Sequence, residues 1–193
     1  MNVVFPRAIT LSALTLVLAL GACKKHEISE KNADPAAVAA KVAAVGDKPQ
    51  PGRWESTLKL ESIDMPGLPP DAKAMMQKQM GTMRTFATCL SPEDAARPAA
   101  DFFNQGKSGC IYDHFTMSDG HLDAAMTCKQ MPGGHPGGTM KIALSGSYGP
   151  GDYEVHTNSS MSMPDGKGMT QAMTMTAHRT GDCKGDELNA KKS

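Results

Sequence analysis

The chain has 193 residues, which is enough for one domain together with processed or linking segments. Its 20 lysines and arginines balance 20 aspartates and glutamates, so the composition gives no support for nucleic-acid binding or for a cationic partner. Nineteen glycines and 13 prolines favour a fold with many turns, which is typical of β-rich proteins rather than helical bundles.

Residues 1–22 have the features of an export signal. Arg7 is their only charged residue, and residues 8–22 are uncharged and mostly apolar. This run is too short for a membrane-spanning helix, which needs about 20 residues. It ends in the sequence LGAC, which resembles the bacterial lipobox. The resemblance implies removal of residues 1–22, lipidation of Cys23 and a membrane as partner through that lipid.

This interpretation has an alternative, and the residue after Cys23 bears on which membrane would hold the anchor. The alternative is an ordinary cleaved signal followed by a cysteine that is present by chance, because small residues are common at cleavage sites. Lys24 follows the cysteine, in place of the aspartate that retains such lipoproteins on the inner membrane. The lipobox resemblance therefore favours anchoring in the outer membrane, with the protein facing the periplasm.

We expect residues 23–50 to be the lipidated cysteine and a tether. Within this segment, Asp34 suits a helix cap, Pro35 the first helical position and Gly46 a helix end, so a short helix over 35–45 is predicted. Its valines lie on one stripe. Because so short a helix is unstable alone, it either docks through this stripe or frays, and we interpret the segment as a spacer.

Residues 51–183 are predicted to form a mainly β domain. The stretch "PGRWESTLKLES" alternates apolar and polar residues, as a half-buried strand does. Three further alternating stretches follow residue 138. Symmetric pairing about their loops places one set of side chains on one face, including Ile142, Val155 and Met173. We expect about seven antiparallel strands with two short helices, as a single curved sheet or a partly closed barrel.

Four cysteines remain after Cys23, and in an exported chain an even number implies disulfides. A three-residue hairpin loop at 118–120 pairs Met117 with His121 and places Cys110 directly opposite Cys128. That leaves Cys89 to pair with Cys183. The chain contains no C-x-x-C motif, so a zinc site or a redox-active pair of that type is not indicated.

The stretches "PGRWESTLKLES", "MPGLPPDA", "CLSPEDA", "CIYDHFTM" and "RTGDC" occur in this order between residues 50 and 183. In this the chain resembles a family of exported bacterial proteins, a domain of unknown function. The resemblance implies one β-rich, cysteine-stapled domain of the cell envelope. It implies no catalytic residue.

Methionines cluster in "MSMPDGKGMTQAMTM", residues 161–175. The strand register places five of them on one face: Met161, Met163, Met169, Met173 and Met175. We expect this face to be part of the core, because methionine can fill the irregular gaps that remain in a core with few aromatic side chains. The alternative is a Cu(I) site, since thioethers are soft ligands and Met-x-Met occurs at 161/163 and at 173/175.

No arrangement typical of an enzyme is apparent: neither G-x-S-x-G nor H-E-x-x-H occurs, and the histidines are not closely spaced. We therefore expect a non-enzymatic binding or envelope-support domain without a cofactor. Its partner would be a lipophilic ligand or an envelope protein. A hydrolase with an unfamiliar site is a less favoured alternative. The polar residues 184–193 are expected to be a disordered tail.

Overall fold

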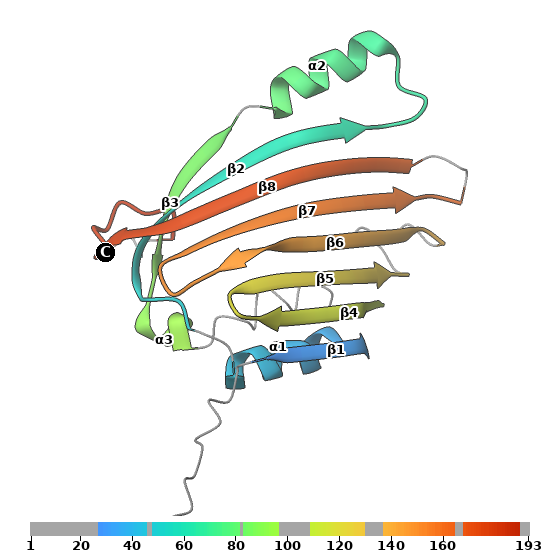
Figure 1. Cartoon of the computed structure of the whole chain (residues 1–193). Helices are drawn as coiled ribbons and strands as arrows, with labels where there is room; N and C mark the ends of the chain where they lie inside the picture. The colour runs from blue at the N-terminus through green and yellow to red at the C-terminus, as the bar shows by residue number, and fades with distance from the viewer. Residues whose placement is uncertain are drawn as a thin grey trace, which may run out of the picture.

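The computed structural model describes residues 27–45, 48–81, 83–96, 109–129, 137–164 and 168–189. Eight antiparallel strands form one curved sheet in the order β1-β4-β5-β6-β7-β8-β2-β3 (Figure 1). They are β1 Ile28–Ala33, β2 Gly52–Asp64, β3 Arg84–Leu90, β4 Cys110–Ser118, β5 His121–Cys128, β6 Thr139–Tyr148, β7 Asp152–Ser162 and β8 Gly168–Gly181. The predicted curved sheet is confirmed. Its edges, β1 and β3, do not pair, so it is not a closed barrel.

The described helices are α1 Pro35–Val45, α2 Pro70–Met80 and α3 Pro92–Ala96. Each begins with a proline, which suits the first turn of a helix because its missing N–H has no partner there. The predicted cap is present at α1, and α3 has a cap as well. The Asp34 side chain accepts a hydrogen bond from the Ala36 N–H, and the Ser91 hydroxyl accepts one from the Asp94 N–H. No described helix is long and apolar enough to cross a membrane.

The segment that we interpreted as a tether is folded over most of its length. Residues 28–33 form β1, which pairs with β4, and α1 packs against both strands. Val38 and Val42 of α1 are buried with Phe115 and Met117 of β4. The helix therefore docks through its apolar stripe, which corrects the spacer interpretation. The sheet consequently has eight strands, where the sequence led us to expect about seven.

The hairpin of β4 and β5 differs from the prediction at its turn but not at its cysteines. Ser118 pairs with His121, so the turn has two residues, Asp119 and Gly120, both with positive φ. This is the conformation of the tight turns that match the twist of a hairpin. A bulge in β4 at Asp113 then shifts the register by one residue and brings Cys110 opposite Cys128.

One face of the sheet carries most of its apolar side chains, and we call it the apolar face. Its best-buried part lies under α1 and is the core of the protein. The core cluster consists of Ile28, Val38, Ala39, Val42, Cys110, Tyr112, Phe115, Met117, Leu122, Ala124, Met126, Cys128 and Val155. Tyr112 and Phe115 meet edge to face, and burial raises the pKa of Tyr112 to about 12.

Candidate functional site

Beyond α1, the apolar face continues over β6, β7, β8 and β2, and this part we call the methionine half. The strand register places on it Met140, Ile142, Leu144, Thr157, Ser159, Met161, Met169, Gln171, Met173, Met175, Leu58 and Leu60. All of these residues are half-buried. The predicted faces of the last three strands are thus confirmed.

The five methionines singled out in the sequence lie together but are not buried core. Met161 faces Met169 across β7 and β8, and Met173 and Met175 lie two positions apart on β8. Met163 lies just after the end of β7. All five are half-buried, whereas Met117 and Met126 are buried in the core under α1. We expected these five methionines to form the buried core, but the methionines that are buried in the core are Met117 and Met126.

Polar groups in the methionine half interact with the sulfur atoms. The Tyr153 hydroxyl donates to Met175 Sδ at 3.9 Å, and Gln171 Nε2 donates to Met173 Sδ at 3.6 Å. Thioether sulfur is a weak acceptor, so these contacts contribute little to stability. Burial raises the pKa of Tyr153, which keeps this hydroxyl protonated. The surface thus combines adaptable apolar groups with a few hydrogen-bond donors.

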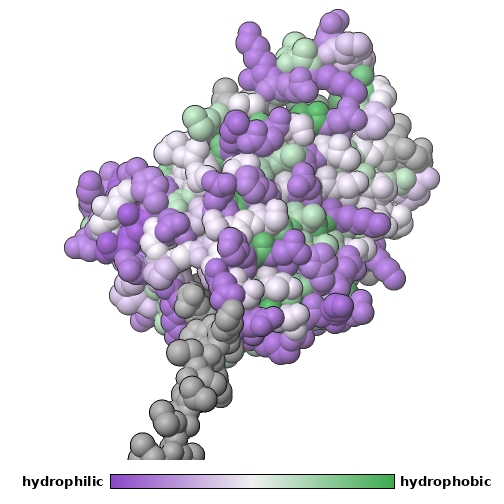
Figure 2. All heavy atoms as spheres, viewed as in Figure 1, coloured by the Kyte–Doolittle hydropathy of each residue, from purple (hydrophilic) through white to green (hydrophobic). Residues whose placement is uncertain are grey.

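The opposite face of the sheet is polar. It carries His114, which bonds Asp123 at 2.7 Å, and His156, which lies 3.0 Å from both Glu154 and Thr174. A shallow hollow of about 480 Å³ crosses it over Ala143 and other small residues. The described residues contain no group of three or more His, Cys, Asp or Glu side chains that could hold a metal. Figure 2 shows one face of the molecule, which is largely hydrophilic with separate small apolar patches.

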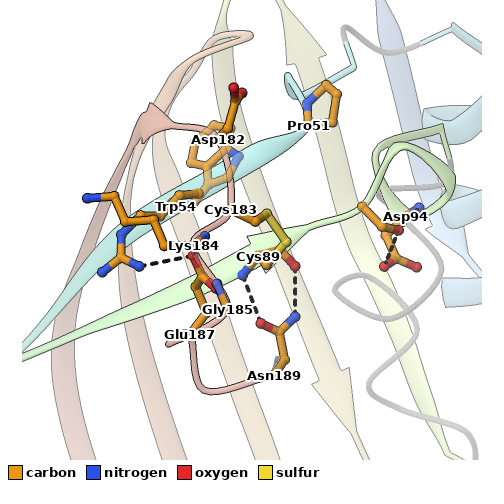
Figure 3. The surroundings of a disulfide bond; sticks show 12 residues. Pro51, Trp54, Cys89, Asp94, Asp182, Cys183, Lys184, Gly185, Glu187 and Asn189 are labelled. Atoms are coloured by element: carbon orange, nitrogen blue, oxygen red, sulfur yellow. Dashed lines mark hydrogen bonds and ion pairs between the residues drawn. A yellow bond between two sulfur atoms is a disulfide. The ribbon is translucent and has the colours of Figure 1, made fainter. Parts of the chain in front are cut away.

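The two predicted disulfides are both formed, Cys110–Cys128 and Cys89–Cys183. The first lies inside the core and the second joins β3 to the segment after β8 (Figure 3). Cys23 and the predicted signal peptide lie outside the described residues.

Residues 183–189, which we call the C-terminal clasp, are folded against β3, so the disordered tail that we expected over 184–193 is wrong for 184–189. Residues 190–193 lie outside the described residues. The Leu188 N–H donates to the Ala87 carbonyl at 3.0 Å. The Asn189 side chain accepts from the Cys89 N–H and donates to the Cys89 carbonyl, both at 2.8 Å (Figure 3). The clasp therefore occupies part of the outer edge of β3, which would otherwise be open to another strand.

A buried carboxylate fixes the clasp. Glu187 accepts hydrogen bonds from the N–H groups of Lys184 and Gly185 and from Arg53 on β2. These bonds, the one from the Lys184 N–H first, lower the pKa of Glu187 to about 2. Arg53 also pairs with Asp186. The sequence does not reveal this contact, because Arg53 and Glu187 are 134 positions apart and no local pattern links them.

Replacing Glu187 with glutamine is expected to destabilise the protein at neutral pH and to make its free energy of unfolding depend less on pH in the acid range. The lowered pKa means that the ionised carboxylate stabilises the folded state above the unfolded pKa near 4.5, and that this contribution is lost as the pH falls toward 2. Urea unfolding at several pH values measures both effects. Asp186→Asn is the matched control, since Asp186 pairs with the same Arg53 from an exposed position. Equal losses in the two variants would contradict the assignment.

Comparison with known proteins gives one family. The family model described as "Protein of unknown function (DUF3617)" matches residues 49–183. No curated protein matches the chain, and no solved structure matches it.

Proposed function

The chain belongs to the DUF3617 family, and because the function of that family is unknown, we propose a role from the geometry of the sheet. The protein is proposed to be a non-enzymatic lipoprotein, anchored through Cys23 in the outer membrane and facing the periplasm. Its methionine half is proposed to bind the acyl chain of a lipophilic ligand.

The observation that carries this proposal is the uneven burial of the apolar face. Among the described helices, α1 packs on β1 and β4, where the residues beneath it are buried, and α2 contacts β2. The methionine half lies farther along the same face and stays half-buried. Methionine is unbranched and polarizable, so a surface rich in it adapts to apolar partners of varied shape. A flexible acyl chain has the chemistry that such a surface accepts.

The predicted anchor supports the same proposal. Ile28, the first residue of β1, follows Cys23 by only five positions. A fully extended chain of that length reaches at most about 18 Å, which is less than the reach of a tether that ended at residue 50. A lipid on Cys23 would therefore keep the sheet next to the membrane, where acyl chains are abundant.

Cu(I) binding is the second candidate, and the arrangement of sulfur atoms favours it. Met173 and Met175 share one side of β8, and Met161 and Met169 face each other on the same side of the sheet. Soft thioethers select Cu(I) over harder cations. Two of the sulfurs already accept hydrogen bonds from protein donors, which a metal would have to displace.

Two double variants at Met173 and Met175 distinguish the candidates. With glutamine at both positions, we expect binding of a fluorescent fatty acid to weaken about tenfold, because two half-buried apolar groups become polar at similar size. With leucine at both positions, fatty-acid binding is expected to persist, since the surface stays apolar. Cu(I) competition against a chromophoric chelator would instead be lost in the leucine variant if the thioethers held the metal.

The matched control is Met75→Gln on α2, where the methionine is 63% exposed and lies off the sheet. It should change neither titration. A wild-type protein that binds neither the fatty acid nor Cu(I) would contradict both candidate functions.

A further inference from the structure

The two disulfides differ in how far a reagent can reach them. Cys110 and Cys128 are buried in the core cluster, with Cys128 fully enclosed. Cys89 is half-buried on the edge strand β3, and Cys183 is exposed. Thiol–disulfide exchange requires a thiolate to reach one of the two sulfurs directly. The Cys89–Cys183 bond is therefore the one open to a thiol in solution.

This bond holds a segment that has little apolar contact of its own. Leu188 is 76% exposed, and Asn189 is also exposed. The clasp is held by the three hydrogen bonds to Ala87 and Cys89 of β3 and by the pairing of Glu187 and Asp186 with Arg53 of β2. Segments with few buried apolar contacts open locally at low free-energy cost, so the covalent link matters for keeping the clasp in place.

We propose that Cys89–Cys183 is a reducible latch for the edge of the sheet. A dithiol attacks one sulfur as a thiolate and forms a mixed disulfide, and its second thiol then displaces the protein cysteine. Two electrons pass from the dithiol to the protein bond. Cys89 and Cys183 end as thiols with the two protons of the dithiol, which itself becomes a disulfide. The clasp then leaves β3.

Release of the clasp changes the edge strand. The Ala87 carbonyl and the Cys89 peptide group lose their partners in the clasp, and an extended strand of another chain could then pair with them. The latch lies at the β3 edge, at the opposite end of the strand order from β1 (Figure 1). Seven strand spacings of about 4.8 Å separate the two edges by roughly 34 Å along the curved sheet.

Dithiothreitol titration of the full chain in detergent tests the latch, with Cys23→Ser so that only the disulfide cysteines can react. We expect Cys89 and Cys183 to become available to alkylation at dithiothreitol concentrations about tenfold lower than Cys110 and Cys128. In the protein reduced only at the latch, hydrogen exchange at the Leu188 and Cys89 amides should accelerate at least about tenfold. Simultaneous reduction of both pairs, or an unchanged Leu188 exchange rate, would overturn the proposal.

The double variant Cys89→Ser/Cys183→Ser gives an independent check without a reductant. It should unfold cooperatively and show fast exchange at Leu188 while the amides of β4 and β5 stay protected. The matched control Cys110→Ser/Cys128→Ser should instead weaken protection throughout the sheet, because that pair lies in the core. Failure of the first variant to fold would also overturn the proposal, since a latch requires a domain that outlasts its opening.

Discussion

Substitution of Val38 by aspartate is expected to lower the free energy of unfolding by about 3–5 kcal/mol, because it places a carboxylate in an apolar environment without a partner. Val38 is fully buried between α1 and the sheet. So large a loss is a substantial part of the roughly 5–15 kcal/mol that stabilises a typical domain. Urea denaturation with intact disulfides measures it.

Ala37 provides the matched control, since it precedes Val38 on α1 and is exposed. Ala37→Asp should change stability by no more than about 0.5 kcal/mol. A chain beginning at Lys48, near the start of the family match at residue 49, should be destabilised more than Val38→Asp, because it lacks Ile28, Val38 and Val42. If this shortened chain were as stable as the longer one, α1 would not be part of the core.

Replacement of Phe115 by alanine is expected to cost about 3–5 kcal/mol, the range found when a buried aromatic ring is deleted and leaves a cavity. Phe115 is fully buried and lies in the core cluster with the residues of α1. Its ring meets the Tyr112 ring edge to face, with the ring centroids 5.3 Å apart. Its removal therefore weakens both the sheet and the docking of the helix. Thermal and urea unfolding of the purified variant measure the loss.

Ile111→Ala is the control, because Ile111 lies on the same strand and is 50% exposed. We expect this variant to stay within about 0.5 kcal/mol of the parent. A large effect at Ile111 together with a small one at Phe115 would mean that the two faces of β4 had been assigned the wrong way round.

Local patterns in the sequence were enough to predict most of the sheet. Alternation placed Ile142, Val155 and Met173 on one face, and the register of β6, β7 and β8 confirms it. The period of two leaves little freedom, because a slip of one residue would expose every apolar side chain of a strand. The disulfide pairing was also predictable, although the register differs from the expected one in two places. The turn at 119–120 has one residue fewer than expected and the bulge at Asp113 adds one, so the two differences cancel.

Only the tertiary structure decided the roles of the two ends of the chain and of the methionines. The strand ISEKNA has no apolar alternation, and its charged residues are typical of an edge strand, where they discourage pairing with another chain. The apolar stripe of α1 is buried because it packs in the core with Phe115, and the Glu187 carboxylate is bound because Arg53 lies beside it. The sequence alone shows neither neighbour. Alternation placed the methionines on one face, but their burial differs along that face: Met117 and Met126 are buried in the core cluster, whereas the five at 161–175 are half-buried. Such contacts join residues far apart in the chain, and no local pattern encodes them.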